Sequence, residues 1–168
     1  MFWKLAFRDL SLLGLCLMTW WLLTGPLAGA HLAVVILCSV FAVVVTALVT
    51  YLGHEWGHLT GAVVARSVVY APSKLFDPFL FHFDSGKNSG RQFVAMSVGG
   101  LIASLVGLVA AIVLLPLELW AAKAVVVLVV IGVITTLVRE VPEAWRVYRG
   151  GALPTGMVYE PYAGQRGC

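Results

Sequence analysis

Apolar residues run along this chain in four long stretches, separated by short connections that are polar or contain glycine and proline. The stretches cover residues 9–28, 32–66, 92–115 and 118–138. A helix needs about 20 predominantly apolar residues to cross the hydrocarbon core of a bilayer, so each stretch predicts a transmembrane helix. The second is longer than one simple span, and we expect it to tilt or to project from the membrane.

The segment 67–91, between the second and third stretches, has a different pattern. Its runs 68–70 and 79–83 are rich in valine, tyrosine and phenylalanine, and Phe79, Phe81 and Phe83 alternate along the second run. Turn-forming residues separate and follow the two runs. The pattern predicts a β-hairpin that lies against the membrane or dips into it. Non-helical backbone at that depth is tolerated only beside protein or a water-filled cavity.

Composition supports an integral membrane protein. Of the 168 residues, 61% are hydrophobic and 11% are charged, and the mean hydropathy is +0.96, whereas about a quarter of the residues of a soluble domain are charged. We therefore expect an all-α membrane protein with one domain, residues 1–168, and a C-terminal tail at 139–168. The net charge of +3 comes from basic residues in connections rather than in a stripe, which argues against a nucleic-acid partner.

The basic residues also predict an orientation. Ten of the eleven lie in the segments 1–8, 66–91 and 139–168, whereas Lys123 alone lies near the connection 116–123. Because basic residues concentrate in cytoplasmic connections, both termini and the segment 67–91 are predicted to be cytoplasmic in a multi-pass protein.

The first stretch has features of a signal peptide, since basic residues precede it and Ala28-Gly29-Ala30 follows it. Trp20 and Trp21, however, stand near its far end, a placement typical of the membrane interface. We expect a retained helix rather than a cleaved signal.

Candidate chemistry lies in the second stretch, where the segment His54–His58 reads His-Glu-Trp-Gly-His. Residues four apart share one helix face, so the imidazoles of His54 and His58 can meet on one Zn²⁺ ion, with Glu55 beside them as the catalytic base. Ionisable side chains at bilayer depth are costly and are normally retained for function. The alternative is a pair of buried histidines hydrogen-bonded to the backbone.

The segment Leu52–Ala62 resembles the signature helix of the site-2 protease family of intramembrane zinc metalloproteases. The segment Met96–Ser104 resembles the small-residue motif in the next core helix of that family, with Gly-Gly in place of Gly-Pro and Ser104 in place of asparagine. The predicted hairpin matches the membrane-associated β-structure of the family, so the resemblance covers about residues 50–150. It implies regulated intramembrane proteolysis, in which the transmembrane helices of membrane-protein substrates are cleaved.

In that family the third zinc ligand is an aspartate in a Leu-Asp-Gly motif of the last core helix. The corresponding stretch Leu137–Arg146 contains Pro142 but no aspartate. Glu143, the nearest carboxylate after the proline, is predicted as the third metal ligand. The open alternatives are Glu140, a residue of the hairpin segment, or no third protein ligand; the hairpin candidates are Asp77, His82 and Asp84.

Three classes of function fit these observations to different degrees. The first is an intramembrane zinc metalloprotease with Glu55 as general base. The second is a non-catalytic subunit of a larger membrane complex that kept the fold and contacts partner helices. The third, a haem or metal-transport protein, is disfavoured because haem ligation in a bundle requires histidines on facing helices.

Overall fold

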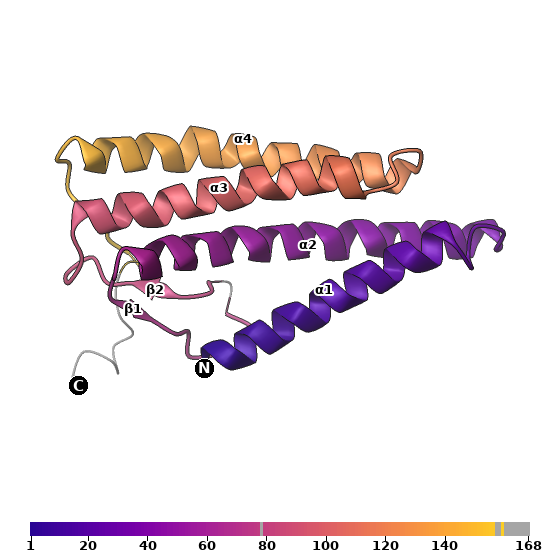
Figure 1. Cartoon of the computed structure of the whole chain (residues 1–168), viewed down its shortest axis with the longest axis horizontal. Helices are drawn as coiled ribbons and strands as arrows, with labels where there is room; N and C mark the ends of the chain where they lie inside the picture. The colour runs from indigo at the N-terminus through magenta and orange to yellow at the C-terminus, as the bar shows by residue number, and fades with distance from the viewer. Residues whose placement is uncertain (78, 157–158, 160–168) are drawn as a thin grey trace.

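The computed structural model of the chain describes residues 1–77, 79–156 and 159. It contains four long helices and a two-stranded sheet (Figure 1). The helices are α1 (Phe2–Thr24), α2 (Leu32–Val64), α3 (Gly90–Leu114) and α4 (Trp120–Tyr148). All four are long and apolar enough to cross a membrane, as the hydropathy pattern predicts.

The predicted hairpin is present between α2 and α3. Strand β1 (Val69–Tyr70) pairs antiparallel with β2 (His82–Phe83), with Val69 opposite Phe83. The segment between the strands continues along the bundle and lies between α2 and the first half of α1 (Figure 1). Phe83 is fully buried, so the aromatic face of this segment packs inward.

Two helices extend well beyond their predicted bounds, and both extensions include charged residues. The helix α1 begins at Phe2 rather than at residue 9 and contains Arg8, which pairs with Asp9 inside the fold. The helix α4 continues from the predicted end at 138 to Tyr148, through Pro142. Proline removes one backbone hydrogen bond from a helix interior, and α4 accommodates that loss. The predicted tail 139–168 therefore begins with helix; residues 160–168 lie outside the described residues.

The buried side chains form two apolar clusters, one toward each end of the bundle. The first joins the end of α1, the start of α2, the end of α3 and the start of α4 around Trp20, Val45 and Val125. The second joins the opposite helix ends to the hairpin segment around Leu5, Phe83 and Phe93. In between, the part of α2 that carries residues 54–58 runs beside α3 and α4.

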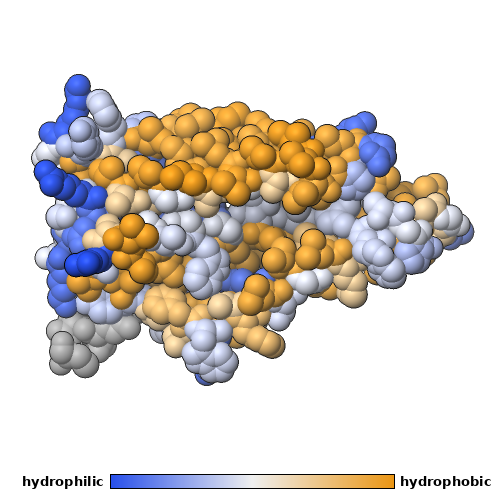
Figure 2. All heavy atoms as spheres, in the orientation of Figure 1, coloured by the Kyte–Doolittle hydropathy of each residue, from blue (hydrophilic) through white to orange (hydrophobic). Residues whose placement is uncertain are grey.

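The outer surface is mostly apolar. Figure 2 shows an apolar band along the helices, with hydrophilic side chains gathered at the end where α2 finishes and α3 begins, and a smaller group at the other end. Exposed leucine, valine and isoleucine side chains make up this band on all four helices. Contiguous apolar surface of this extent is what a lipid-facing bundle requires.

Candidate metal centre

Two histidines of α2 meet on one face of that helix. The Nε2 atoms of His54 and His58 lie 3.0 Å apart, and the two rings meet edge to face with their centroids 4.4 Å apart. A spacing of four residues places side chains one above the other on a helix. The helix alone therefore delivers both imidazoles to the same point, as the motif predicts.

A carboxylate from α4 completes the group. In Glu140, Oε1 lies 3.4 Å from Nε2 of His54 and Oε2 lies 3.2 Å from Nε2 of His58. The three residues each offer one ligand atom, and these atoms lie within 4.8 Å of one another. They are close enough to hold one metal ion.

The other ring nitrogens are held by α3. The backbone carbonyl of Met96 lies 3.0 Å from Nδ1 of His58, and the carbonyl of Gly100 lies 3.1 Å from Nδ1 of His54. The Ser104 hydroxyl adds a contact of 2.8 Å to Nδ1 of His54. Because a carbonyl oxygen can only accept, both Nδ1 atoms must donate. Bonds of this kind fix the tautomer and the ring orientation of metal-binding histidines.

This tautomer leaves the centre with an excess of lone pairs. With Nδ1 protonated, each neutral imidazole presents a bare Nε2, and both face a carboxylate. The Oε2 atom of Glu140 is buried and has no hydrogen-bond partner in the described part of the chain. Buried polar atoms normally have a partner. We therefore expect a positive charge at the point where the three groups converge.

The pairwise distances are near those expected around a tetrahedral ion. Zinc bound to nitrogen and oxygen at about 2.0–2.2 Å with tetrahedral angles places its ligand atoms about 3.3–3.5 Å apart. The two Nε2 atoms lie 3.0 Å apart, and the nitrogen–oxygen distances are 3.4 Å from His54 to Oε1 and 3.2 Å from His58 to Oε2 of Glu140. Two histidines and one carboxylate also leave one coordination position open.

Glycines bring α2 and α3 together beneath the histidines. A Cβ atom on Gly57 would lie 2.4 Å from Cβ of Ala103, and one on Gly61 would lie 2.3 Å from the carbonyl oxygen of Ala95. From the other side, a Cβ on Gly100 would lie 2.2–2.5 Å from three atoms of the His58 ring. The small residues of both sequence motifs therefore allow the helix contact that supports the two imidazoles.

Glu55 lies next to the centre and has its own supports. Both Glu55 and the three candidate ligands line one cavity of about 200 Å³. The backbone N–H of Leu80, from the hairpin segment, donates a hydrogen bond to Glu55, and the Tyr51 hydroxyl lies one turn earlier on α2 and also bonds to it. Glu55 is thus placed beside the candidate ligand atoms without being among them.

The remaining candidates lie apart from the three ligand atoms. Glu143 lines the same cavity, but its carboxylate is 3.6 Å from the Arg146 guanidinium, one turn further along α4. The predicted role of Glu143 as third ligand stays a prediction, and the geometry favours Glu140. Asp84 is buried and accepts hydrogen bonds from the Tyr70 hydroxyl and the Gly86 backbone.

The other two hairpin candidates are also placed by the segment itself. Asp77 accepts a hydrogen bond from the backbone N–H of Phe79, two residues later, and His82 is buried in β2 with its ring edge to face with Phe79. In this structure, all three hairpin candidates therefore make contacts within the hairpin segment itself.

Tyr159 is a cavity residue that sequence reasoning missed. It lines the cavity from beyond the end of α4, and its carbonyl accepts a hydrogen bond from the backbone N–H of Ser85 at 3.1 Å. Burial, followed by the carboxylates around the cavity, of which Glu143 contributes most, raises the pKa of Tyr159 to about 12. The phenol therefore stays protonated at neutral pH. A tyrosine in the C-terminal tail, outside any motif or periodic pattern, carries no sequence signal that predicts this position.

Comparisons of the chain with protein-family models, with curated proteins and with solved structures give no match. The resemblance to the site-2 protease family stays a prediction from the two motifs, and the functional argument rests on the geometry of the centre itself.

Proposed function

We propose that this protein is a membrane-embedded zinc peptidase that cleaves the transmembrane segments of membrane-protein substrates. The observation that carries the proposal is the convergence of three lone-pair atoms, from His54, His58 and Glu140, beside a separate carboxylate, Glu55, in one cavity. Three protein ligands with one open position are typical of a catalytic zinc site, whereas structural zinc sites are closed by four.

Each residue then has a defined role. His54, His58 and Glu140 would hold the ion. Bound zinc supplies Lewis acidity, which activates a water molecule and polarises the carbonyl of the bond to be cleaved. The Glu55 carboxylate takes a proton from the attacking water and returns it to the leaving amine. The bonds from Leu80 and Tyr51 hold that carboxylate in place for both transfers.

Two further cavities would let a substrate segment reach the candidate metal centre laterally, between the helices. One, of about 290 Å³, lies between α2 and α4 and reaches His54 and Glu140; the other, of about 300 Å³, lies between α3 and α4 and also reaches Glu140. A substrate segment entering there has to lose its helical hydrogen bonds before its amides can be attacked. The hydroxyl oxygens of Thr50, Thr135 and Thr136 along the first cavity can accept hydrogen bonds from the N–H groups of an unwound backbone.

The decisive experiment measures both bound zinc and cleavage products for the same set of variants. The protein is purified in mild detergent, and zinc per folded chain is measured for the unaltered chain and for His54→Ala, His58→Ala and Glu55→Gln. We expect about one zinc per chain, lost in both histidine variants and kept in Glu55→Gln. Cleavage of co-expressed single-span membrane proteins, followed as new termini by mass spectrometry, is expected to fall at least about 100-fold in Glu55→Gln.

Zinc far below one per folded chain would overturn the proposal. Full zinc with equal cleavage by Glu55→Gln and the unaltered chain would also contradict it. In either case the alternative function, a non-catalytic subunit of a larger membrane complex, would take its place.

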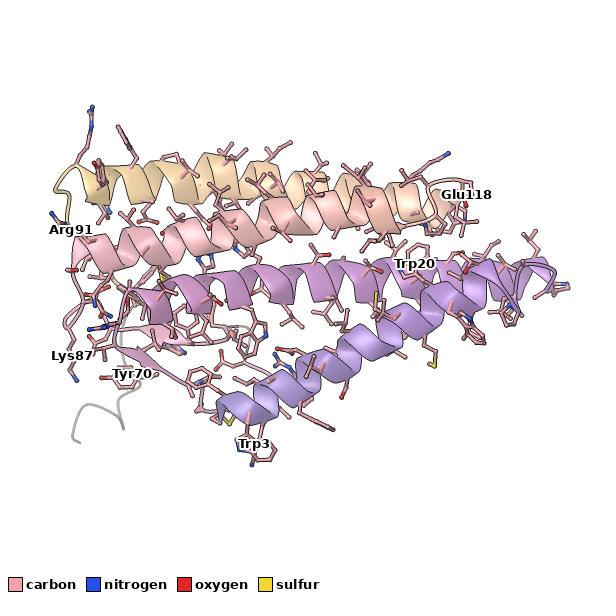
Figure 3. The ribbon with its side chains drawn as sticks, in the orientation of Figure 1. Trp3, Trp20, Tyr70, Lys87, Arg91 and Glu118 are labelled. Atoms are coloured by element: carbon pink, nitrogen blue, oxygen red, sulfur yellow. The ribbon has the colours of Figure 1, made fainter. Side chains whose placement is uncertain are left out.

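We also propose that both termini are cytoplasmic, from the distribution of the basic residues. Lys87 and Arg91 lie at the end where α2 finishes, and Glu118 lies at the opposite end (Figure 3). In a Cys168→Ser background, we expect Lys87→Cys to react with a membrane-impermeant maleimide only in inside-out vesicles. Glu118→Cys, the matched control, is expected to react only in right-side-out vesicles; the reverse pattern would invert the topology.

A further inference from the structure

A charged pair of α1 contacts the metal-binding helix directly. The Arg8 Nε atom lies 2.6 Å from Oδ1 of Asp9. The other carboxylate oxygen of Asp9 accepts a hydrogen bond of 2.8 Å from the indole N–H of Trp56. Trp56 is the residue between Glu55 and Gly57, so α1 is bonded to the middle of the His-Glu-Trp-Gly-His segment.

The same pair contacts the hairpin segment. The Arg8 Nη1 atom donates a hydrogen bond to the backbone carbonyl of Leu75. Five residues later, the backbone N–H of Leu80 donates to Glu55. Leu5 of α1 and Leu80 also belong to the same apolar cluster, in which both are almost fully buried. One face of α1 therefore contacts both α2 and the hairpin segment, which lie on either side of Glu55.

Because Arg8 and Asp9 are largely buried, keeping both of them charged costs free energy. The side chains of Arg8 and Asp9 are only 14% and 10% exposed. Removing two charges from water costs several kcal/mol per ion before their attraction is counted. Apolar packing between α1 and α2 could be achieved without them. The directional bonds are what the pair adds.

We propose that Arg8 and Asp9 are positioning residues for Glu55, which they fix by bonding α1 to the helix on one side of that carboxylate and to the hairpin segment on the other. This inference rests on the proposed function for its catalytic consequence. It assigns α1, which lies outside the motifs carrying the family resemblance, a part in the active site. The hydrogen bonds described for Arg8 and Asp9 reach Trp56 and Leu75 rather than the three candidate ligands, so metal binding is expected to be independent of the pair.

Two substitutions disconnect the pair with little change in shape. Trp56→Phe removes the indole N–H and keeps an aromatic ring, and Asp9→Asn removes the charge that Arg8 faces. The matched control is Trp3→Phe, because Trp3 lies on the same helix, points away from the bundle and is 70% exposed (Figure 3). Glu55→Gln is the reference for complete loss of the base.

Three quantities are measured in each variant: zinc per chain, hydrogen exchange of the segment 75–82, and the kinetic constants for cleavage. We expect zinc to be unchanged and the Leu80 amide to exchange about 10-fold faster, because its partner is held less firmly. We expect kcat to fall about 10- to 100-fold with KM within about twofold, as for a displaced catalytic group. Trp3→Phe is expected to match the unaltered chain in all three.

The outcomes separate this inference from the proposed function. Unchanged exchange at Leu80 in both variants would overturn the inference, whether or not any cleavage is detected. Faster exchange with an unchanged kcat, while Glu55→Gln is inactive, would reduce the pair to a structural clamp and would also overturn it. If Glu55→Gln cleaves as well as the unaltered chain, the proposed function fails, and the catalytic part of this inference fails with it.

Discussion

Replacing Glu140 with alanine is expected to weaken zinc binding by more than about 100-fold, because it removes one of the three proposed ligands, and loss of a residue that only orients a ligand already costs about 10- to 100-fold. The two imidazoles that remain come from one helix and leave the α4 side of the ion open. The affinity is measured by competition with a chromophoric chelator in detergent. Because the carboxylate and the imidazoles come from different helices, metal binding is also expected to join α4 to α2 in the unaltered chain.

Glu143→Ala is the matched control for this substitution. Glu143 lies three residues further along the same helix, lines the same cavity and pairs with Arg146 at 3.6 Å, an exposed pair that contributes little to stability. We expect its zinc affinity to stay within about threefold of the unaltered chain, the size of effect that losing one exposed charge produces. Loss of zinc in Glu143→Ala with retention in Glu140→Ala would restore Glu143 as the ligand that the sequence predicts.

The choice between these two carboxylates shows where sequence reasoning reaches its limit. Both glutamates follow the last apolar stretch, and Pro142 between them favours a helix end just before it. In the structure α4 continues past its predicted end at 138 and through Pro142, and the Glu140 carboxylate faces His54 and His58 of α2. Which of the two carboxylates lies nearest the imidazoles thus depends on the continuity and rotation of α4. Those depend on packing against α2 and α3 rather than on local sequence.

The parts that the sequence does predict are those set by a period or by a length. Four apolar stretches give four helices, and a spacing of four residues gives the shared face of His54 and His58. The alternation of phenylalanines gives the segment that carries β2. Each of these depends only on residues close together in the chain, so no knowledge of the partner element is needed.

Contacts between distant elements are what the sequence leaves undetermined. Trp20 is predicted at a membrane interface, yet it is buried and donates a hydrogen bond to the Thr46 hydroxyl of α2 at 2.9 Å. Ser104 stands where the resembling family usually has asparagine, and it contacts Nδ1 of His54. The hydrogen bond that the Trp56 indole donates to Asp9 is a third case. In each, a side chain of ordinary type acquires its role from a helix that packs against it.

Replacing Gly100 of α3 with alanine is expected to weaken metal binding by displacing the imidazole of His58. The added Cβ would lie 2.2–2.5 Å from Cε1, Nε2 and Nδ1 of His58, a separation that real side chains do not adopt. Either the imidazole turns away or α3 shifts away from α2, and the carbonyl of Met96 then loses its bond to Nδ1. We expect zinc affinity to fall about 10- to 100-fold and the free energy of unfolding to fall by about 1–3 kcal/mol, as in other overpacked cores.

Gly14→Ala separates this steric effect from the general effect of alanine in a helix. A Cβ on Gly14, in α1, has no atom within 4 Å, and alanine is favoured over glycine in a helix by about 0.5–1 kcal/mol. The control is therefore expected to be equal to or more stable than the unaltered chain in SDS-induced unfolding, with the same zinc affinity. Because Gly100→Ala has the same helical advantage, any loss it shows measures the contact with His58. A Gly100→Ala protein that binds zinc as tightly as Gly14→Ala would mean that the imidazole of His58 is not held against α3 by the Met96 carbonyl.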